Sequence, residues 1–154
     1  MLKDPKHPFN DVGCNATALR KASRRLTQLY DSALEHSGLR STQLAILVEL
    51  NNWSEHPPTL AELAEALVIE RSALGHTLRP LEREGWVVLQ PGEDRRQRHV
   101  VITPKGKAKC KEGVRLWATA QHRFEDVYGR SEAATLRQML LGIAHDERLA
   151  TLKD

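Results

Sequence analysis

Apolar residues recur at steps of three and four along most of this chain, a spacing that predicts amphipathic helices. Two segments, Trp86–Gln90 and His99–Thr103, are instead rich in β-branched and apolar residues and predict two antiparallel strands. Prolines, glycines and capping residues separate the helical segments; Gly38 ends the first helix, and Ser41 or Thr42 is expected to cap the second. The predicted helices cover residues 15–35, 41–50, 60–67, 71–84 and 104–128, with a last one beginning near residue 131.

The stretch Thr59–Thr103 carries the most specific pattern. Thr59 and Glu62 have the spacing of a capping box at the start of a short helix, and Gly85 is suited to the end of the next one. Two short helices followed by a hairpin is the order of a winged helix-turn-helix, in which one helix enters the major groove of DNA. We therefore expect a mainly α fold with a small β-hairpin wing.

The second helix of this unit has two distinct faces. Leu74, Leu78 and Leu81 are expected to pack inward. Their expected partners are Leu63, Leu67 and Ile69. The other face carries small and hydrogen-bonding side chains that could reach base edges or phosphates. These candidate DNA contacts are Arg71, Ser72, Ala73, Gly75, His76 and Arg79. On an isolated helix, such a face would be interpreted as an ordinary solvent-exposed surface. The capped helix before it and the hairpin after it favour DNA binding instead.

The predicted hairpin loop, residues 91–98, gathers charge at its tip. Asp94, Arg95, Arg96 and Arg98 lie within five residues. Three guanidinium groups repel one another in isolation and gain from a phosphate or a narrow minor groove. Asp94 is expected to fix one of the arginines through a bidentate pair. A loop charged only for solubility is the alternative, and the acid set among the arginines favours the DNA-binding interpretation.

The terminal helices predict an assembly. The helix over residues 104–128 would be about 35 to 40 Å long at 1.5 Å per residue, longer than the small winged unit. Its apolar stripe, and those of the first and last helices, need a partner, which a twofold homodimer with interlocked terminal helices would supply. The expected organisation is an N-terminal arm (1–13), a helical dimerisation region (14–56 and 104–154) and a winged helix-turn-helix domain (57–103).

Composition narrows the function without deciding it. A net charge of +3 over 154 residues permits nucleic-acid binding. We find neither a signal peptide nor an apolar run long enough to span a bilayer, so we expect a cytoplasmic protein that does not associate with a membrane. Two cysteines do not make a disulfide scaffold, and the seven histidines lack zinc-site spacing, so no metal and no cofactor are predicted. Motifs for phosphate, dinucleotide, hydrolase and metalloprotease sites are absent, and an enzyme is not expected.

From Cys14 to Leu149 the chain resembles the MarR family of winged helix-turn-helix transcriptional regulators. The segments that carry the resemblance are LAELAEAL, LRPLEREGWV, GEDRRQR and ITPKGKA. The resemblance implies a homodimer built on the first, fifth and sixth helices, which binds palindromic promoter DNA, usually represses, and often releases DNA when a small phenolic or other ligand, or an oxidant, acts on it. It also places Ser72, Ala73, Gly75 and His76 on the groove-facing positions, and Asp94 and Arg96 on the Asp-x-Arg pair of the wing.

The chain departs from the family pattern at four positions. Val68 stands where a turn glycine is frequent, Gly75 and His76 stand where serine and arginine are frequent, and Pro80 interrupts the recognition helix. Proline removes a backbone hydrogen bond, here the one to the His76 carbonyl, and kinks a helix. Pro80 lies well past the first turn, so the base-reading end can remain regular.

Two kinds of switch are possible. The family's ligand pocket lies between the dimer helices and the DNA-binding unit. Its candidate lining residues are Arg20, Arg24, Tyr30, Trp53 and Trp117, aromatic walls with a cation suited to a phenolate or carboxylate, although each tryptophan taken alone is more often core. Cys14 near a helix N-terminus is a redox candidate, with a small buried hydrophobe as the alternative, and Cys110 is read as core. A third possibility is an architectural winged helix without effector control.

Overall fold

The computed structural model describes residues 13–53, 55–94 and 96–151, so the predicted arm over residues 1–13 lies almost wholly outside the described residues. Within these ranges the fold is mainly helical with one two-stranded antiparallel hairpin, which confirms the predicted fold class. The elements are α2 (Asn15–Leu34), η1 (Glu35–Ser37), α3 (Ser41–Asn52), α4 (Leu60–Ala66), α5 (Arg71–Arg83), β1 (Val87–Pro91), β2 (Arg98–Ile102), α6 (Pro104–Tyr128), α7 (Arg130–Ala144) and η2 (Glu147–Leu149).

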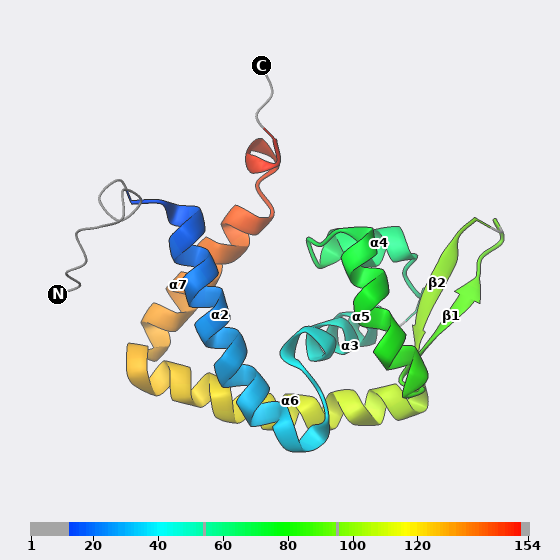
Figure 1. Cartoon of the computed structure of the whole chain (residues 1–154), viewed down its shortest axis with the longest axis horizontal. Coiled ribbons are helices and arrows are strands. Elements are labelled where there is room, and N and C mark those ends of the chain that lie inside the picture. Colours follow the sequence, from blue (N-terminus) through cyan, green and yellow to red (C-terminus); the bar gives the residue numbers. More distant parts are fainter. Residues whose placement is uncertain (1–12, 54, 95, 152–154) are drawn as a thin grey trace.

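Helix α6 is the long connection of the molecule (Figure 1). Its N-terminal end adjoins the hairpin and α5, and α2 and α7 lie toward its C-terminal end. Contacts of α6 with α2, α3 and α7 join the two groups of elements. At about 1.5 Å per residue, its 25 residues span about 37 Å, as the sequence predicted.

One continuous apolar core joins α3, α4, α5 and the hairpin. Leu74, Leu78 and Leu81 are buried in it as predicted, and Leu63 lies among them. Of their other expected partners, Leu67 is partly buried, but Ile69 keeps 39% of its surface exposed, so the inward placement of Ile69 was wrong. Helix α3 buries Leu44, Leu47 and Leu50, and it also buries Ile46, so that α3 is covered on more than one side.

A third segment, just before α4, pairs with the hairpin, which the sequence did not predict. Strands β1 and β2 pair from Val87 opposite Ile102 to Pro91 opposite Arg98, each about one residue from its predicted bounds. On the outer side of β2, Val100 N–H donates to the Pro58 carbonyl at 2.9 Å, and Thr59 forms a bridge to His99. The segment before α4 is thereby fixed to the wing.

The helix ends follow the sequence with one correction. The capping box at α4 is confirmed, since Thr59 Oγ1 accepts from Glu62 N–H at 3.2 Å and the Glu62 carboxylate accepts from Thr59 N–H at 2.7 Å. Helix α3 is capped at Arg40 rather than at Ser41 or Thr42. The first turn of α3 is instead served by a carboxylate and an amide, since the Ser41 N–H donates to Asp31 Oδ1 at 2.7 Å and the Arg40 N–H donates to Gln43 Oε1 at 2.9 Å.

Apolar side chains of the terminal helices stay largely exposed in the single chain. Helix α2 buries Leu34 and α7 buries Ala133, and their remaining large apolar residues are partly or fully exposed. The exposed positions are Leu19 on α2, Val114, Trp117, Val127 and Tyr128 on α6, and Leu136, Met139, Leu141 and Ile143 on α7. None of the described helices has the length and apolar character needed to cross a bilayer.

Candidate nucleic-acid interface

The turn between α4 and α5 sets the position of the recognition helix. Val68 N–H donates to the Glu65 carbonyl and Ile69 N–H to the Ala64 carbonyl, both at 3.0 Å, which is the Schellman pattern of a helix end. Val68 occupies the left-handed position of this motif with φ of 54°. A β-branched residue in that conformation costs about 1–2 kcal/mol, which is why glycine is frequent there. The departure noted in the sequence is therefore a strained one.

The recognition helix α5 presents its predicted polar face to solvent. Side chains on this face are exposed, and Gly75 is half-buried; the exposed residues are Arg71, Ser72, Ala73, His76 and Arg79. A methyl group placed on Gly75 would meet no packed neighbour within 4 Å, so this glycine is not required by the fold. Helix α5 continues through Pro80 to Arg83, and its first turns remain helical.

The wing tip is shaped by Asp94. Its Oδ1 accepts from the Arg96 backbone N–H at 2.9 Å, and its carbonyl accepts from Gln97 N–H at 2.9 Å. Within the described part of the wing, the Asp94 carboxylate makes no ion pair with the guanidinium of Arg96 or Arg98. Asp94 therefore fixes the backbone and leaves the side chains of Arg96 and Arg98 exposed; the expected bidentate pair stays a prediction for Arg95, which lies outside the described residues.

His99 is a wing residue that sequence reasoning missed. Its Nδ1 lies 2.8 Å from the Pro57 carbonyl oxygen, in hydrogen-bond contact. A methyl group on Gly92 would come within 3.0 Å of the His99 Nε2, so the imidazole also fills the base of the wing tip. The contact joins residues 42 positions apart, a separation that no local sequence pattern reports.

The start of α6 is locked to the end of α5. Thr103 caps α6 and donates its hydroxyl to the Gly85 carbonyl at 2.7 Å, and Lys105 Nζ donates to the Glu84 carbonyl at 2.7 Å. Gly106 lies so close to Trp86 that a Cβ there would collide with the Trp86 carbonyl oxygen. These contacts fix the end of the recognition helix to the start of the long helix.

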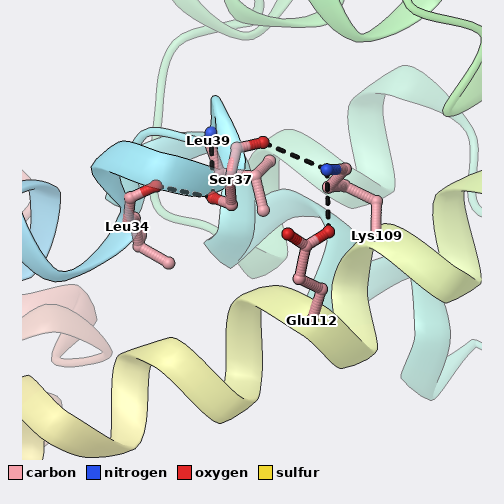
Figure 2. A network of polar contacts seen from close by, with 5 residues as sticks. All are labelled: Leu34, Ser37, Leu39, Lys109 and Glu112. Carbon is pink, nitrogen blue, oxygen red and sulfur yellow. Dashed lines mark hydrogen bonds and ion pairs between the residues drawn. The ribbon is translucent and has the colours of Figure 1, made fainter.

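A lysine ties α6 to the turn after α2 (Figure 2). Lys109 Nζ donates to the Ser37 carbonyl at 3.0 Å and to Glu112 Oε2 at 2.8 Å, and lies 5.5 Å from the centre of the Trp86 ring. Ser37 is buried; its hydroxyl donates to the Leu34 carbonyl at 2.6 Å and accepts from Leu39 N–H at 3.1 Å. Because one ammonium touches both the turn and Trp86, it connects the terminal helices to the core of the α3–β2 region.

Comparisons with known proteins agree with this geometry. The family model described as "MarR family" matches residues 39–97, which run from the start of α3 to the wing tip. The transcriptional regulator YwoH of Bacillus subtilis is 31% identical over 94 residues, covering 61% of this chain and 67% of YwoH. This chain belongs to the MarR family. Regulators of this family are not enzymes, and they bind DNA as dimers.

Solved structures similar to this chain include complexes with DNA. The Mycobacterium tuberculosis regulator MosR in complex with DNA is 29% identical, with a TM-score of 0.80 over 90% of this chain and 99% of MosR. The repressor CouR of Rhodococcus jostii bound to a 23-mer duplex is 26% identical, with a TM-score of 0.78 over 93% of this chain and 100% of CouR. The present protein is thus a MarR-family DNA-binding transcriptional regulator with the fold of relatives seen on DNA.

A second feature of this MarR protein is an apolar hollow among the terminal helices. It has a volume of about 850 Å³ and is lined from α2, α3, α6 and α7. Two of the predicted ligand residues meet in it, Tyr30 and Trp117, whose rings stack with centroids 6.1 Å apart. Tyr30 Oη donates to Gln121 Oε1 at 2.6 Å. Partial burial raises the pKa of Tyr30, and the Glu125 carboxylate adds to the effect.

The other predicted ligand residues lie elsewhere. Arg20 and Arg24 are exposed on α2, and the described lining of the hollow contains neither of them. Trp53 follows the end of α3, where its indole N–H donates to Glu49 at 2.9 Å. These three residues were therefore wrongly placed in the pocket, because residue type alone does not report which side chains turn toward the hollow.

The two cysteines have opposite environments. Cys14 caps α2, is partly exposed, and its sulfur accepts a hydrogen bond from Thr17 Oγ1 at 3.3 Å. The Thr17 hydroxyl and backbone hydrogen bonds lower the pKa of the Cys14 thiol, with Arg20 a minor contributor. Cys110 is buried in the core, as predicted, and desolvation raises its pKa.

Proposed function

We propose that this MarR-family regulator is a repressor that binds palindromic promoter DNA as a homodimer and releases it when a small aromatic effector binds. The observation that carries the proposal is the joint exposure of the α5 polar face and the wing arginines, which share one rigid support. Because Thr103, Lys105 and Gly106 fix α5 to α6, a change among the terminal helices would reach the recognition helix.

The proposed DNA contacts divide by chemistry. Ser72, His76 and Arg79 carry hydrogen-bonding groups that suit base edges or phosphates in the major groove. Ala73 and Gly75 are small and would allow close approach. Arg96 and Arg98, with Arg71 at the helix start, would contribute the phosphate contacts that make binding depend on salt. Asp94 supports the wing through its backbone contacts rather than by touching DNA.

The homodimer is supported by the exposed apolar stripes of α2, α6 and α7. Side chains such as Val127, Met139 and Leu141 keep 53–61% of their surface exposed in the single chain. Contiguous apolar exposure of this kind marks an interface, and a twofold arrangement repeats the same patch on both chains. Two recognition helices related by that axis would match a palindromic site.

The effector proposal is supported by the hollow around Tyr30 and Trp117. Its lining is aliphatic and aromatic with a few hydroxyls, and the described lining residues include no lysine or arginine. Of the two effector classes expected from the sequence, a neutral phenol therefore fits better than a carboxylate, which would lose hydration without gaining a cation. Tyr30 Oη donates its proton to Gln121 Oε1 and can still accept a hydrogen bond from a phenol hydroxyl.

The DNA part of the proposal is tested by selecting binders from a pool of random duplexes at physiological salt. We expect an inverted repeat with half-sites about 34 to 36 Å apart, bound by two chains. Binding that falls steeply with salt but shows no preference among sequences would instead identify an architectural protein without an operator.

The effector part is tested on the selected duplex by titrating matched pairs of small phenols and benzoates. Phenols are expected to release DNA at lower concentrations than benzoates of the same size. Trp117→Ala should raise the phenol concentration needed, while Trp53→Ala, outside the hollow, serves as the matched control. Equal release by both classes would contradict the assignment of a neutral ligand.

One observation favours a second trigger. Cys14 is partly exposed and its thiol pKa is lowered, a combination that favours the reactive thiolate. Under this alternative, peroxide rather than a phenol would release DNA, and Cys14→Ser would abolish that release while leaving phenol release intact. Release by peroxide that persists in Cys14→Ser would remove the redox alternative.

A further inference from the structure

Val68 combines two properties that folding alone does not explain. Its φ of 54° lies in the left-handed region, which a β-branched residue adopts only with strain. Its side chain is 53% exposed, so burial gives little in return. The neighbouring motif is otherwise satisfied, because both of its backbone hydrogen bonds form at 3.0 Å. Strain that persists without a packing reason is a sign of a functional position.

The position of Val68 indicates which function this could be. It lies three residues before Arg71, where the recognition helix begins, and the N-terminal end of such a helix faces base edges. Figure 1 shows α4 and the start of α5 on the same upper side of the view as the tip of the wing. An exposed apolar group at this end of α5 is therefore suited to an apolar partner on DNA.

Major-groove chemistry limits that partner to one group. Base edges there present donors and acceptors, and the only apolar group is the C5-methyl of thymine, which apolar side chains contact. Alanine or glycine at position 68 would reach less far, and a polar residue would not favour the methyl. Ile69, which is 39% exposed, adds apolar surface beside Val68.

We propose that Val68 packs against a thymine C5-methyl in each half-site and is a specificity-determining residue of this regulator. The proposal rests on the proposed placement of α5 in the major groove. It assigns a purpose to the strained turn: a glycine there would relax the backbone and leave the methyl uncovered.

The test is a cycle between Val68→Gly and thymine-to-deoxyuridine replacement in the duplex that the wild type selects from a random pool. Deoxyuridine lacks only the C5-methyl. Burying one methyl corresponds to about a fourfold change in affinity, or about fifteenfold for two half-sites. We expect wild type to lose this factor at one thymine position per half-site. Val68→Gly should bind the thymine duplex correspondingly less tightly and be indifferent to the replacement.

Stability measurements separate this effect from a folding defect. Val68→Gly and Val68→Asn both suit the left-handed conformation, so their melting temperatures are expected to equal or exceed that of wild type. Unchanged affinity in Val68→Gly, an equal loss on both duplexes, or a selected half-site without a sensitive thymine would each overturn the proposal. If wild type selects no sequence at all, the proposed function itself fails, and the two failures are thereby distinguished.

Discussion

The α3–β2 region and the terminal helices use the same sequence device with opposite results. Leucines of α5 at steps of four and three are at most 1% exposed, whereas Leu136 on α7 remains 39% exposed. Helical periodicity specifies which face is apolar but not which partner covers it. In the α3–β2 region the partner lies in the same chain; for the terminal helices we propose that it lies in a second chain.

The largest effect expected from this difference concerns paired leucine truncations. Leu78→Ala should lower the free energy of unfolding by about 2–5 kcal/mol, because it opens a cavity in a closed core. Leu136→Ala removes the same atoms from an exposed site, so its cost should appear chiefly as a weaker dimer. Urea unfolding and sedimentation equilibrium measure the two effects. An unchanged dimer dissociation constant in Leu136→Ala would contradict the proposed interface.

A smaller effect is expected from two helical glycines. Gly106→Ala should destabilise the protein by about 1–3 kcal/mol or more, because the new methyl meets the Trp86 carbonyl. Gly75→Ala meets open space and should raise stability by up to about 1 kcal/mol, since alanine favours helix. If Gly75 faces the groove, however, its alanine variant should bind the operator less tightly despite melting later. Equal operator affinity would remove Gly75 from the proposed interface.

These pairs also show how far the sequence reached. The Thr59–Glu62 capping box, the three α5 leucines and the hairpin were predictable because each is a local pattern, and the structure confirms them. The Val68 strain was anticipated only as a departure from a frequent glycine. What could not be foreseen depends on contacts between distant residues: His99 with Pro57, Lys109 with Ser37, and the Asp31 carboxylate with the Ser41 N–H at the start of α3.

The candidate site divides along the same line. The exposed face of α5 follows from helical periodicity and the wing from the charged loop between the two predicted strands, so their residues could be named in advance. The residues that line the hollow among the terminal helices could not be predicted. Arg20 and Arg24 lie on the same helix as Tyr30, but only Tyr30 lines the hollow. A solvent-facing surface can be predicted from one helix alone, whereas a cavity built from four elements also requires knowing how each helix is rotated relative to the others.

The wing offers a more modest prediction on charge. Arg96→Ala should weaken operator binding and reduce the slope of log affinity against log salt by about one, since one phosphate contact is lost. Arg123→Ala removes the same charge from an exposed position on α6 and serves as the control, with slope and affinity unchanged. Equal changes in both variants would mean that net charge, rather than the shaped wing, governs binding.

The smallest effect expected is on the cysteines, and it bears on whether the terminal helices respond to oxidants. Since hydrogen bonds from Thr17 lower the pKa of Cys14, its thiolate forms at lower pH, and the alkylation rate should rise at lower pH than for an ordinary thiol. Cys110 should react far more slowly, because it is buried and its pKa is raised. Thr17→Val should move the Cys14 profile to higher pH without changing Cys110. Mass spectrometry of iodoacetamide-treated protein resolves both sites. If Cys14 is as unreactive as Cys110 in the assembled protein, it is a covered hydrophobe of the dimer seam, and control by a ligand in the hollow remains the sole proposed trigger.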